Sequence, residues 1–217
     1  EVCFDTETTG LNPREDKIIG LSFCFKKGEA FYCPVSEDES ILKLYEPFFN
    51  HSKILKIAHN IKFDAAILKS NDISIDGPIF DTMIAHYLLQ PEQRHSMDIL
   101  AANYLSYKPI SIESLIGKKG KNQKSLNEIP LDVVKDYAAE DADVTFQLYT
   151  IFKQLLEEGE INQLFYEIEM PLSMVLMEME HEGIRLNTAT LSTFSSQLKA
   201  SIINLKSSIY SLSLIHI

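Results

Sequence analysis

The chain has 217 residues, of which 45% are hydrophobic and 24% are charged, a balance typical of a globular protein. Its formal net charge of −11 argues against general adhesion to nucleic acid, although not against an enzyme whose acids bind cations. The sequence shows no apolar run long enough to span a bilayer and no signal-peptide pattern, so we expect no membrane partner. Three cysteines without a C-x-x-C pattern indicate reduced, packed thiols in a cytoplasmic protein.

The first residues predict a strand that ends in a pair of acids. Val2 and Phe4 are apolar, and Asp5 and Glu7 leave one face of the strand together because side chains alternate. Two neighbouring carboxylates repel each other, and oxygen ligands favour a hard cation such as Mg²⁺ or Mn²⁺. The residues from Thr8 to Gly10 then break the strand. The pair is therefore a candidate metal site; the alternative is two exposed acids on an edge strand.

The elements that follow predict a mixed sheet with helices. Strands over residues 17–26 and 29–35, joined by a Lys26-Lys27-Gly28 turn, form an antiparallel meander with residues 2–7. Helical periods and two short buried strands alternate after the meander: residues 37–50 (helix), 54–58 (strand), 63–69 (helix), 79–80 (strand), 82–89 and 97–105 (helices). This order predicts an α/β fold in which helices flank the sheet.

The second half of the sequence predicts mainly helices. A basic loop over residues 117–127 precedes a long helix, which Pro130 opens and which runs from residue 131 to about 158. We expect residues 1–158 to form one domain, and residues 159–217 to be an all-helical segment that begins a second one. Two helices are expected there, over residues 162–182, where Pro171 interrupts the pattern, and over residues 188 to about 210. Both ends of the sequence look cut, and residues 211–217 are interpreted as a possible non-native tail.

The long helix contains an acid that does not fit its surroundings. A stripe at helical spacing is apolar except near its centre: Val134, Ala138, Asp141, Thr145, Leu148 and Phe152. Burying an unpaired carboxylate is costly, so Asp141 should be paired, protonated or bound to a metal. Tyr137 lies one turn earlier on the same face, where a phenol can orient an attacking water. The alternative is a core tyrosine beside a salt-bridged aspartate.

A third polar group follows the strand expected at residues 54–58, where the sequence reads HNIKFD from His59 to Asp64. Asn60 is a plausible helix cap, and Asp64 is an acid of the kind found near helix N-termini. Those structural roles explain the segment taken alone. The combination is more specific: D-x-E at a strand end, N-x-x-F-D at a strand-to-helix turn, and Y-x-x-x-D on a late helix.

Together these motifs resemble the DEDD exonucleases, in the variant with tyrosine in the third motif. Five stretches resemble the proofreading domain of bacterial DNA polymerase I: residues 4–8 (FDTET), 79–83 (IFDTM), 94–98 (RHSMD), 120–123 (GKNQ) and 137–145 (YAAEDADVT). Residues 168–186 resemble the entry into the family A polymerase domain, a continuation that RNase D-like relatives lack. The resemblance implies a ribonuclease H-like fold.

The resemblance also implies a function, a 3′–5′ exonuclease that removes mismatched 3′-terminal nucleotides from DNA as 5′-mononucleotides. Asp5, Glu7, Asp64 and Asp141 would hold two divalent cations, Mg²⁺ or Mn²⁺, with Asp5 shared by both. Tyr137 would orient the attacking water. The implied partner is DNA with a single-stranded or frayed 3′ end, and the implied state is a monomer whose parent is a DNA polymerase.

Substrate contacts are expected from residues around the acids: Thr6, Thr8, Leu11, His59, Asn60, Phe63, Arg94, Lys121 and Gln123. Leu11 and Phe63 are apolar candidates to pack on the last bases, although Leu11 also fits an ordinary turn hydrophobe. The loop lysines either contact phosphates or form a solvated loop: Lys118, Lys119, Lys121 and Lys124. Relatives can carry an aromatic residue near Ile112, so the stacking contact that it makes is in doubt here. His86 is expected to be a packed core histidine.

Two other functions remain open. An RNase D-type exonuclease would act on RNA, and comparing DNA with RNA at matched 3′ ends separates it from a DNA enzyme. A non-catalytic module that holds single-stranded DNA, or only supports a polymerase, predicts metal-independent binding and no release of nucleotides. Because all four carboxylates and Tyr137 are present, we expect an active nuclease.

Overall fold

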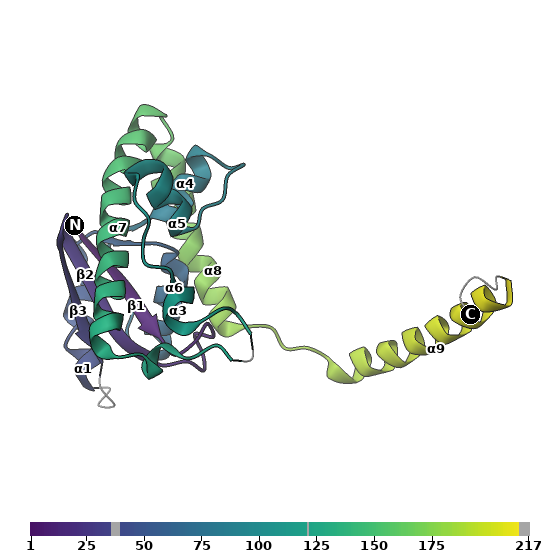
Figure 1. Ribbon diagram of the computed structural model, residues 1–217. Coiled ribbons are helices and arrows are strands. Elements are labelled where there is room, and N and C mark those ends of the chain that lie inside the picture. The colour runs from purple at the N-terminus through teal and green to yellow at the C-terminus, as the bar shows by residue number, and fades with distance from the viewer. Residues whose placement is uncertain (36–39, 121, 213–217) are drawn as a thin grey trace. The chain divides into compact units, whose positions relative to one another are not determined.

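A computed structural model describes residues 1–35, 40–120 and 122–212 of the chain, so Lys121 and the final residues 213–217 lie outside it. The chain divides into two compact units, Glu1–His181 and Glu182–Ile217. The first unit contains a five-stranded sheet in the order β3-β2-β1-β4-β5 (Figure 1). Its strands are β1 (Val2–Thr8), β2 (Ile18–Lys26), β3 (Glu29–Pro34), β4 (Lys56–Ala58) and β5 (Ile79–Asp81). The first three pair antiparallel and the last two pair parallel, which confirms the expected mixed sheet.

The acid pair lies on the central strand of this sheet. On one side Asp5 pairs with Ser22 and Glu7 with Gly20 of β2. On the other side β4 pairs only with the start of β1, up to Cys3. The carboxyl end of β1 therefore runs on past its parallel neighbour, which is where open α/β sheets form clefts. This position excludes the alternative in which the acids lie on an edge strand.

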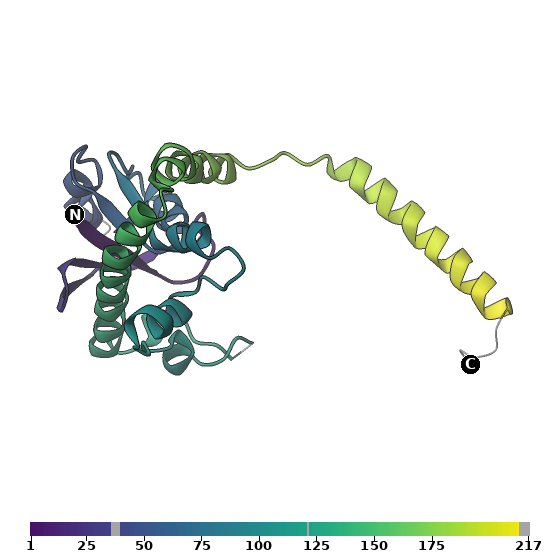
Figure 2. The same ribbon diagram turned by 90° about the horizontal axis from the view of Figure 1, so that it is seen from above.

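Helices make up most of the remaining described chain: α1 (Ser40–Lys43), α2 (Glu46–Phe49), α3 (Ile61–Ser70), α4 (Thr82–Leu89), α5 (Met97–Leu100), α6 (Ile112–Ile116), α7 (Leu131–Glu158), α8 (Met170–Glu182) and α9 (Thr188–Leu212). The long helix α7 lies along one face of the sheet and contacts its first four strands (Figures 1 and 2). Every residue of its expected stripe is buried, so the burial of Asp141 is confirmed. On the sheet, Phe4 packs edge-on against Phe49 of α2, with ring centroids 5.1 Å apart.

Several helices differ from the sequence expectation. The described part of residues 37–50 forms two four-residue helices, because Pro47 lies in the first turn of α2 and cannot continue a preceding helix. The expected helix 162–182 is π-helical over Leu164–Glu169 and becomes α-helical at Met170, next to Pro171. A π-helical turn over Ala101–Leu105 likewise completes the expected helix 97–105. The short helix α6 lies in a stretch for which no element was expected.

The second unit consists of an extended segment and α9, in which no described residue is buried. Among the residues that the structure describes, no helix combines the length and the apolar composition needed to cross a bilayer. The first compact unit ends at His181, whereas the sequence analysis places a domain boundary after residue 158.

Candidate active site

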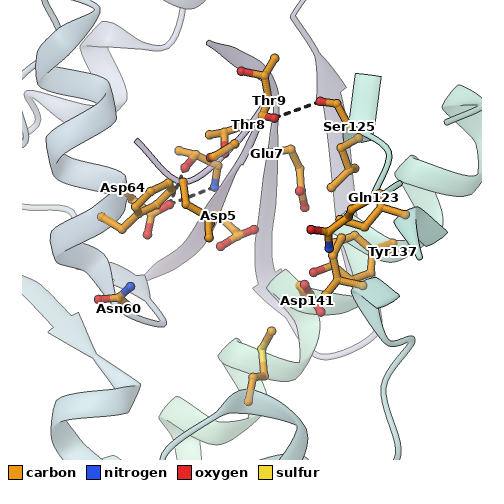
Figure 3. A pocket seen from close by; sticks show the side chains of 18 of the residues that line it. Asp5, Glu7, Thr8, Thr9, Asn60, Asp64, Gln123, Ser125, Tyr137 and Asp141 are labelled. Carbon is orange, nitrogen blue, oxygen red and sulfur yellow. Dashed lines mark hydrogen bonds between the residues drawn. The ribbon is translucent and has the colours of Figure 1, made fainter. Parts of the chain in front are cut away.

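Three carboxylates from two elements meet beside the end of β1. Asp5 and Glu7 come from β1 and Asp141 comes from α7, and each offers an oxygen within 4.8 Å of the other two. Figure 3 shows Asp141 and Tyr137 on one side of the acid pair and Asp64 and Asn60 on the other. Only oxygen ligands are present in this group, which suits a hard divalent cation.

The fourth carboxylate, Asp64, is fixed by the strand itself. Its Oδ1 accepts hydrogen bonds from the backbone N–H and the hydroxyl of Thr6, at 3.1 and 2.6 Å. Side chains alternate along β1, so Thr6 points away from its neighbours Asp5 and Glu7 and toward α3. The bond joins residues 58 positions apart and holds α3 against the end of β1. Asp64 therefore lines the same cavity as the other three acids, with Oδ1 already bonded.

Burial raises the pKa of every acid in the cluster, and repulsion between the acids adds to the shift of Glu7, Asp64 and Asp141. Burial raises the pKa of Asp5 to about 7. Burial first, and then the charge of Asp5, raise the pKa of Glu7, Asp64 and Asp141 well above their usual range. Without a cation, the site therefore cannot carry its full negative charge near neutral pH.

One oxygen of the cluster shows that the site fits a cation. Glu7 is 5% exposed, and its Oε1 is buried without a hydrogen-bond partner among the described residues. A buried polar atom without a partner is costly in an apolar protein interior, and a cation would satisfy it. The raised pKa values, the oxygen-only donors and this orphaned atom agree with the metal dependence expected of such an exonuclease.

Tyr137 lies one turn before Asp141 on α7 and lines the cavity beside it. Burial, together with the nearby charge of Asp141, raises the pKa of the phenol above its usual value. The hydroxyl therefore keeps its proton throughout the neutral range and remains a hydrogen-bond donor.

The acids lie in a cavity of about 600 Å³. Most of the substrate contacts expected from the sequence line it: Thr6, Thr8, Leu11, His59, Asn60, Phe63 and Gln123. Arg94 is not among its described lining residues, and Lys121 lies outside the described residues. Of the other loop lysines, Lys124 lines the cavity, whereas Lys118 and Lys119 are exposed and are not among its described lining residues.

The capping role expected of Asn60 belongs to another residue. Asn60 precedes α3 in a left-handed conformation with φ of 67°, and its side chain makes no capping bond. Asp81 instead accepts from the backbone N–H of Asn60 and Ile61, at 3.1 and 2.9 Å, and from those of Met83 and Ile84. One buried carboxylate thus caps both α3 and α4. The F-D-T motif drew attention to Asp81 in the sequence. No local sequence pattern, however, could show that Asp81 also caps α3, which begins 20 residues earlier.

Two histidines lie near the site, one buried in the core and one at the edge of the cavity. His86 is fully buried, as expected, and its Nδ1 lies 2.7 Å from Nδ1 of His95. His59 lies at the edge of the cavity, where its Nδ1 is 2.8 Å from the hydroxyl of Thr82. Burial lowers the pKa of His59 to about 4, so the ring is neutral at physiological pH.

Sequence reasoning found only part of the far wall of the cavity, at Ile112, Gln123 and Lys124, and missed Ile116 and Ser125. Ile112 and Ile116 of α6 line it, together with Ser125, whose hydroxyl donates to the carbonyl of Thr9 at 2.9 Å. Glu140 of α7 holds the start of this wall, because its carboxylate accepts hydrogen bonds from the Tyr107 hydroxyl and from the backbone N–H of Ile110. The sequence signal for this contact was the presence of a second acid, Glu140, next to Asp141.

Comparisons with known proteins agree with this geometry. A sequence family described as 3′–5′ exonuclease matches residues 1–157. The DNA polymerase I of Borreliella burgdorferi is 39% identical over 193 residues, which are 86% of this chain and 21% of that protein. The chain thus spans about a fifth of that relative's length.

Solved structures show the same fold. The polymerase domain of Pol1 from M. smegmatis, in complex with a DNA primer-template and dNTP, has a TM-score of 0.75 at 21% identity, over 97% of this chain and 33% of its own. NrnC from Brucella melitensis, with bound Mg²⁺, has a TM-score of 0.65 at 22% identity, over 86% of this chain and 89% of its own. The mixed sheet, the converging acids and the sequence match together place the chain in the family of 3′–5′ exonuclease domains carried by DNA polymerase I.

Proposed function

We propose that the chain removes nucleotides one at a time from the 3′ end of DNA and releases 5′-mononucleotides, using two divalent cations, Mg²⁺ or Mn²⁺. The observation that supports this most is the meeting of Asp5, Glu7 and Asp141 in one cavity, with Glu7 Oε1 unpartnered among the described residues. These three acids would hold one cation, and Asp64, on the other side of Asp5, would complete the second site. When bound, such cations polarise the scissile phosphate and favour ionisation of the attacking water.

The chain's own residues orient the reaction. The Tyr137 hydroxyl donates a hydrogen bond to the attacking water and keeps its proton. Glu7 accepts a hydrogen bond from that water. The water oxygen forms a bond to the terminal phosphorus as the bond from phosphorus to the 3′ oxygen breaks. A proton passes to that oxygen, which leaves a 3′ hydroxyl on the shortened strand and frees one 5′-mononucleotide.

Selection of a strand end follows from the walls of the cavity. Leu11 and Phe63 are apolar and pack on the last bases, while Asn60 and Thr8 hydrogen-bond the terminal nucleotide. Gln123 and Lys124 on the opposite wall contact the sugar and phosphates. Ile112 offers no aromatic ring, so the terminal base packs on an aliphatic surface there.

The relatives that the chain matches are much longer than the chain, so we also consider the protein of which it would be a part. We propose that residues 1–158 form the exonuclease domain of a bacterial DNA polymerase, and that residues 159–217 begin its polymerase domain. The protein would act as a monomer on bacterial DNA in the cytoplasm. RNA remains the alternative substrate, and a direct comparison of the two nucleic acids decides between them.

The test measures release of 5′-mononucleotides from single-stranded DNA labelled at its 3′ end, and from RNA of the same sequence. Wild-type chain with Mg²⁺ or Mn²⁺ should release the label, and EDTA should stop release. Asp5→Asn should slow release by about 10²–10³-fold, because it removes charge from the reacting centre. The matched control is Asp132→Asn, an exposed aspartate at the start of α7.

Three results separate the candidate functions. Faster release from DNA than from RNA supports the proofreading function, and the reverse supports the RNA exonuclease. Binding of DNA without release, in a folded chain with either metal, would mean that the domain is a scaffold.

A further inference from the structure

Residues 9–17, which we call the Leu11 loop, connect β1 to β2 at the mouth of the cavity. Thr9, Gly10 and Leu11 line the cavity. Leu11 is 85% exposed, so little of the protein packs on its side chain. The position of Leu11 over the active site is therefore set by the backbone of the loop and by whatever holds that backbone.

Hydrogen bonds make the Leu11 loop one internally connected unit. Asp16 accepts from the hydroxyl of Thr9 at 2.9 Å and from the N–H of Asn12 at 2.7 Å. A Cβ on Gly10 would lie 2.6 Å from the Asp16 carboxylate, so that carboxylate fills the inside of the turn. The side chain of Asn12 in turn accepts from the N–H of Arg14 at 3.2 Å. These bonds connect Arg14, through Asn12 and Asp16, to Thr9 on the other side of Leu11.

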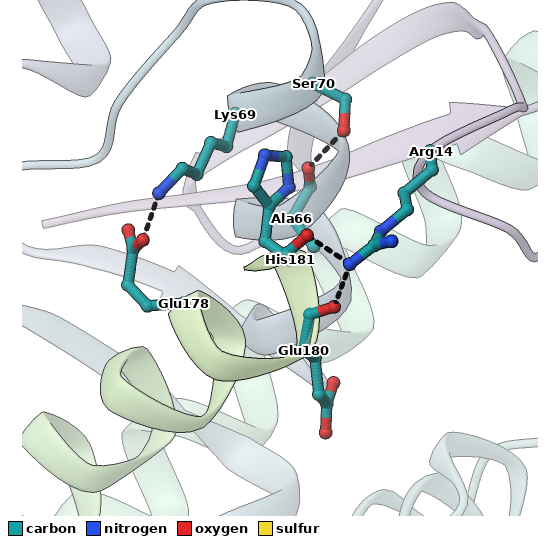
Figure 4. Close-up of polar contacts among 7 residues, drawn as sticks. All are labelled: Arg14, Ala66, Lys69, Ser70, Glu178, Glu180 and His181. Atoms are coloured by element: carbon teal, nitrogen blue, oxygen red, sulfur yellow. Dashed lines mark hydrogen bonds and ion pairs between the residues drawn. The ribbon is translucent and has the colours of Figure 1, made fainter. Parts of the chain in front are cut away.

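Arg14 attaches this loop to the end of a distant helix. Its guanidinium donates to the carbonyl oxygen of Glu180, at 2.5 Å, and to that of His181 (Figure 4). These are among the last carbonyls of α8, which have no partner within the helix and lie at the negative end of its dipole. A cation with two donors is well suited to that position.

Helix α8 is itself fixed to a wall of the cavity. Lys69 of α3 pairs with Glu178, and Lys62 pairs with Glu180 at 2.6 Å. Beneath these exposed pairs, Met177 of α8 is buried in a small apolar cluster with Ala65 and Ala66 of α3. The same helix α3 carries Phe63 and Asp64 into the active site. The loop, α8 and α3 thus form one connected assembly.

We propose that Arg14 is a positioning residue of the exonuclease, which caps α8 and thereby holds Leu11 over the last bases of the substrate. The working unit of the nuclease then extends to His181, beyond residues 1–157, which the 3′–5′ exonuclease family matches. This inference rests on the proposed function, because that function assigns Leu11 to the end of the strand.

Hydrogen–deuterium exchange of the whole chain tests the positioning without requiring activity. Arg14→Ala should speed exchange of the amides in the Leu11 loop about tenfold, since one anchor of a hydrogen-bonded unit is lost. Arg14→Lys should have a smaller effect, because an ammonium keeps the positive charge and N–H donors at the end of α8. The matched control is Arg185→Ala, at an exposed arginine outside the assembly. Unchanged exchange in Arg14→Ala, with its melting temperature preserved, overturns the proposal.

Kinetics then test the consequence for the substrate. Arg14→Ala should raise KM for oligothymidylate about fivefold, and adding Leu11→Ala should raise it no further, because coupled residues are not additive. Hydrolysis of the p-nitrophenyl ester of thymidine 5′-monophosphate, which has no second base, should stay within about twofold of wild type. Additive effects of the two substitutions, or an unchanged KM, contradict the role of Arg14. A wild type that cleaves neither substrate would reject the proposed function, while the exchange result would still decide whether Arg14 holds the loop.

Discussion

At the scale of single residues, the acids of the active site oppose folding unless a cation is present. Burial raises the pKa of both Asp5 and Glu7 above that of a free carboxylate, and the charge of Asp5 adds to the shift of Glu7. Asp141 shares this environment on α7. Functional sites commonly keep such unfavourable groups because they serve binding or catalysis. Metal binding should therefore appear as a gain in stability.

We predict that Asp5→Asn makes the metal-free chain more stable, and increasingly so as the pH rises. The pKa of Asp5 is raised to about 7 in the folded state. The contribution of this carboxyl to the free energy of unfolding is therefore intact at low pH, where it is protonated in both states, and is lost as the pH rises through 7. An amide cannot ionise and escapes this loss. The melting temperature should exceed that of wild type by about 2–6 °C at pH 8 and hardly at all at pH 4.

The same melting experiment contains its own controls. Mn²⁺ should raise the melting temperature of wild type. The increase should be much smaller for Asp5→Asn, because this chain lacks the carboxylate that both cations would share. Asp132→Asn, an exposed acid on α7, should behave as wild type in both conditions. A destabilised Asp5→Asn at pH 8, or an equal response to Mn²⁺ in both chains, would contradict this view of the acids.

At the scale of elements, the cavity wall formed by α6 depends on an anchor outside the helix. None of the residues of α6 is buried, so packing does not fix its position. Just before α6, both carboxylate oxygens of Glu140 on α7 accept hydrogen bonds, one from the hydroxyl of Tyr107 and one from the N–H of Ile110, each at 2.5 Å. Because Glu140 is next to Asp141 in the sequence, these two bonds link the wall to the part of α7 that carries Asp141.

Removing this anchor should loosen the wall and leave the acids in place. We predict that Glu140→Ala speeds amide exchange at Ile110 by about tenfold, the equivalent of one hydrogen bond to a charged group. Tyr107→Phe removes one arm and should give a smaller increase. Tyr87→Phe, at an exposed tyrosine on α4, is the control. Protection of Ile110 that survives Glu140→Ala would show that other contacts hold the wall.

The elements also show what the sequence could and could not predict. The apolar stripe that surrounds Asp141 and the strand end at Asp5 are local patterns, and both elements form where expected. The contact of Thr6 with Asp64 spans 58 residues, and that of Arg14 with α8 spans more than 160, so neither leaves a local signal. Helix α6 escaped prediction because it has only five residues, so the spacing of Ile112, Leu115 and Ile116 covers little more than one turn.

At the scale of the whole molecule, charge decides how the chain meets its substrate. A net charge of −11 repels the DNA backbone at long range, and salt screens this repulsion beyond about 8–10 Å. Attraction must then come from short-range contacts in the cavity, from Lys124 on its wall, and from the cations that neutralise the acids. DNA binding should consequently depend on the divalent metal as well as on ionic strength.

The most direct test of the central claim follows the length of single-stranded DNA labelled at its 5′ end while Mn²⁺ is present. A 3′–5′ exonuclease should give a ladder that shortens by one nucleotide at a time, with the label retained on the longest remaining piece. Asp5→Asn should leave most of the strand at full length over the time in which wild type digests it. Early release of a labelled mononucleotide, cuts inside the strand, or an unchanged strand with folded wild-type chain would contradict it.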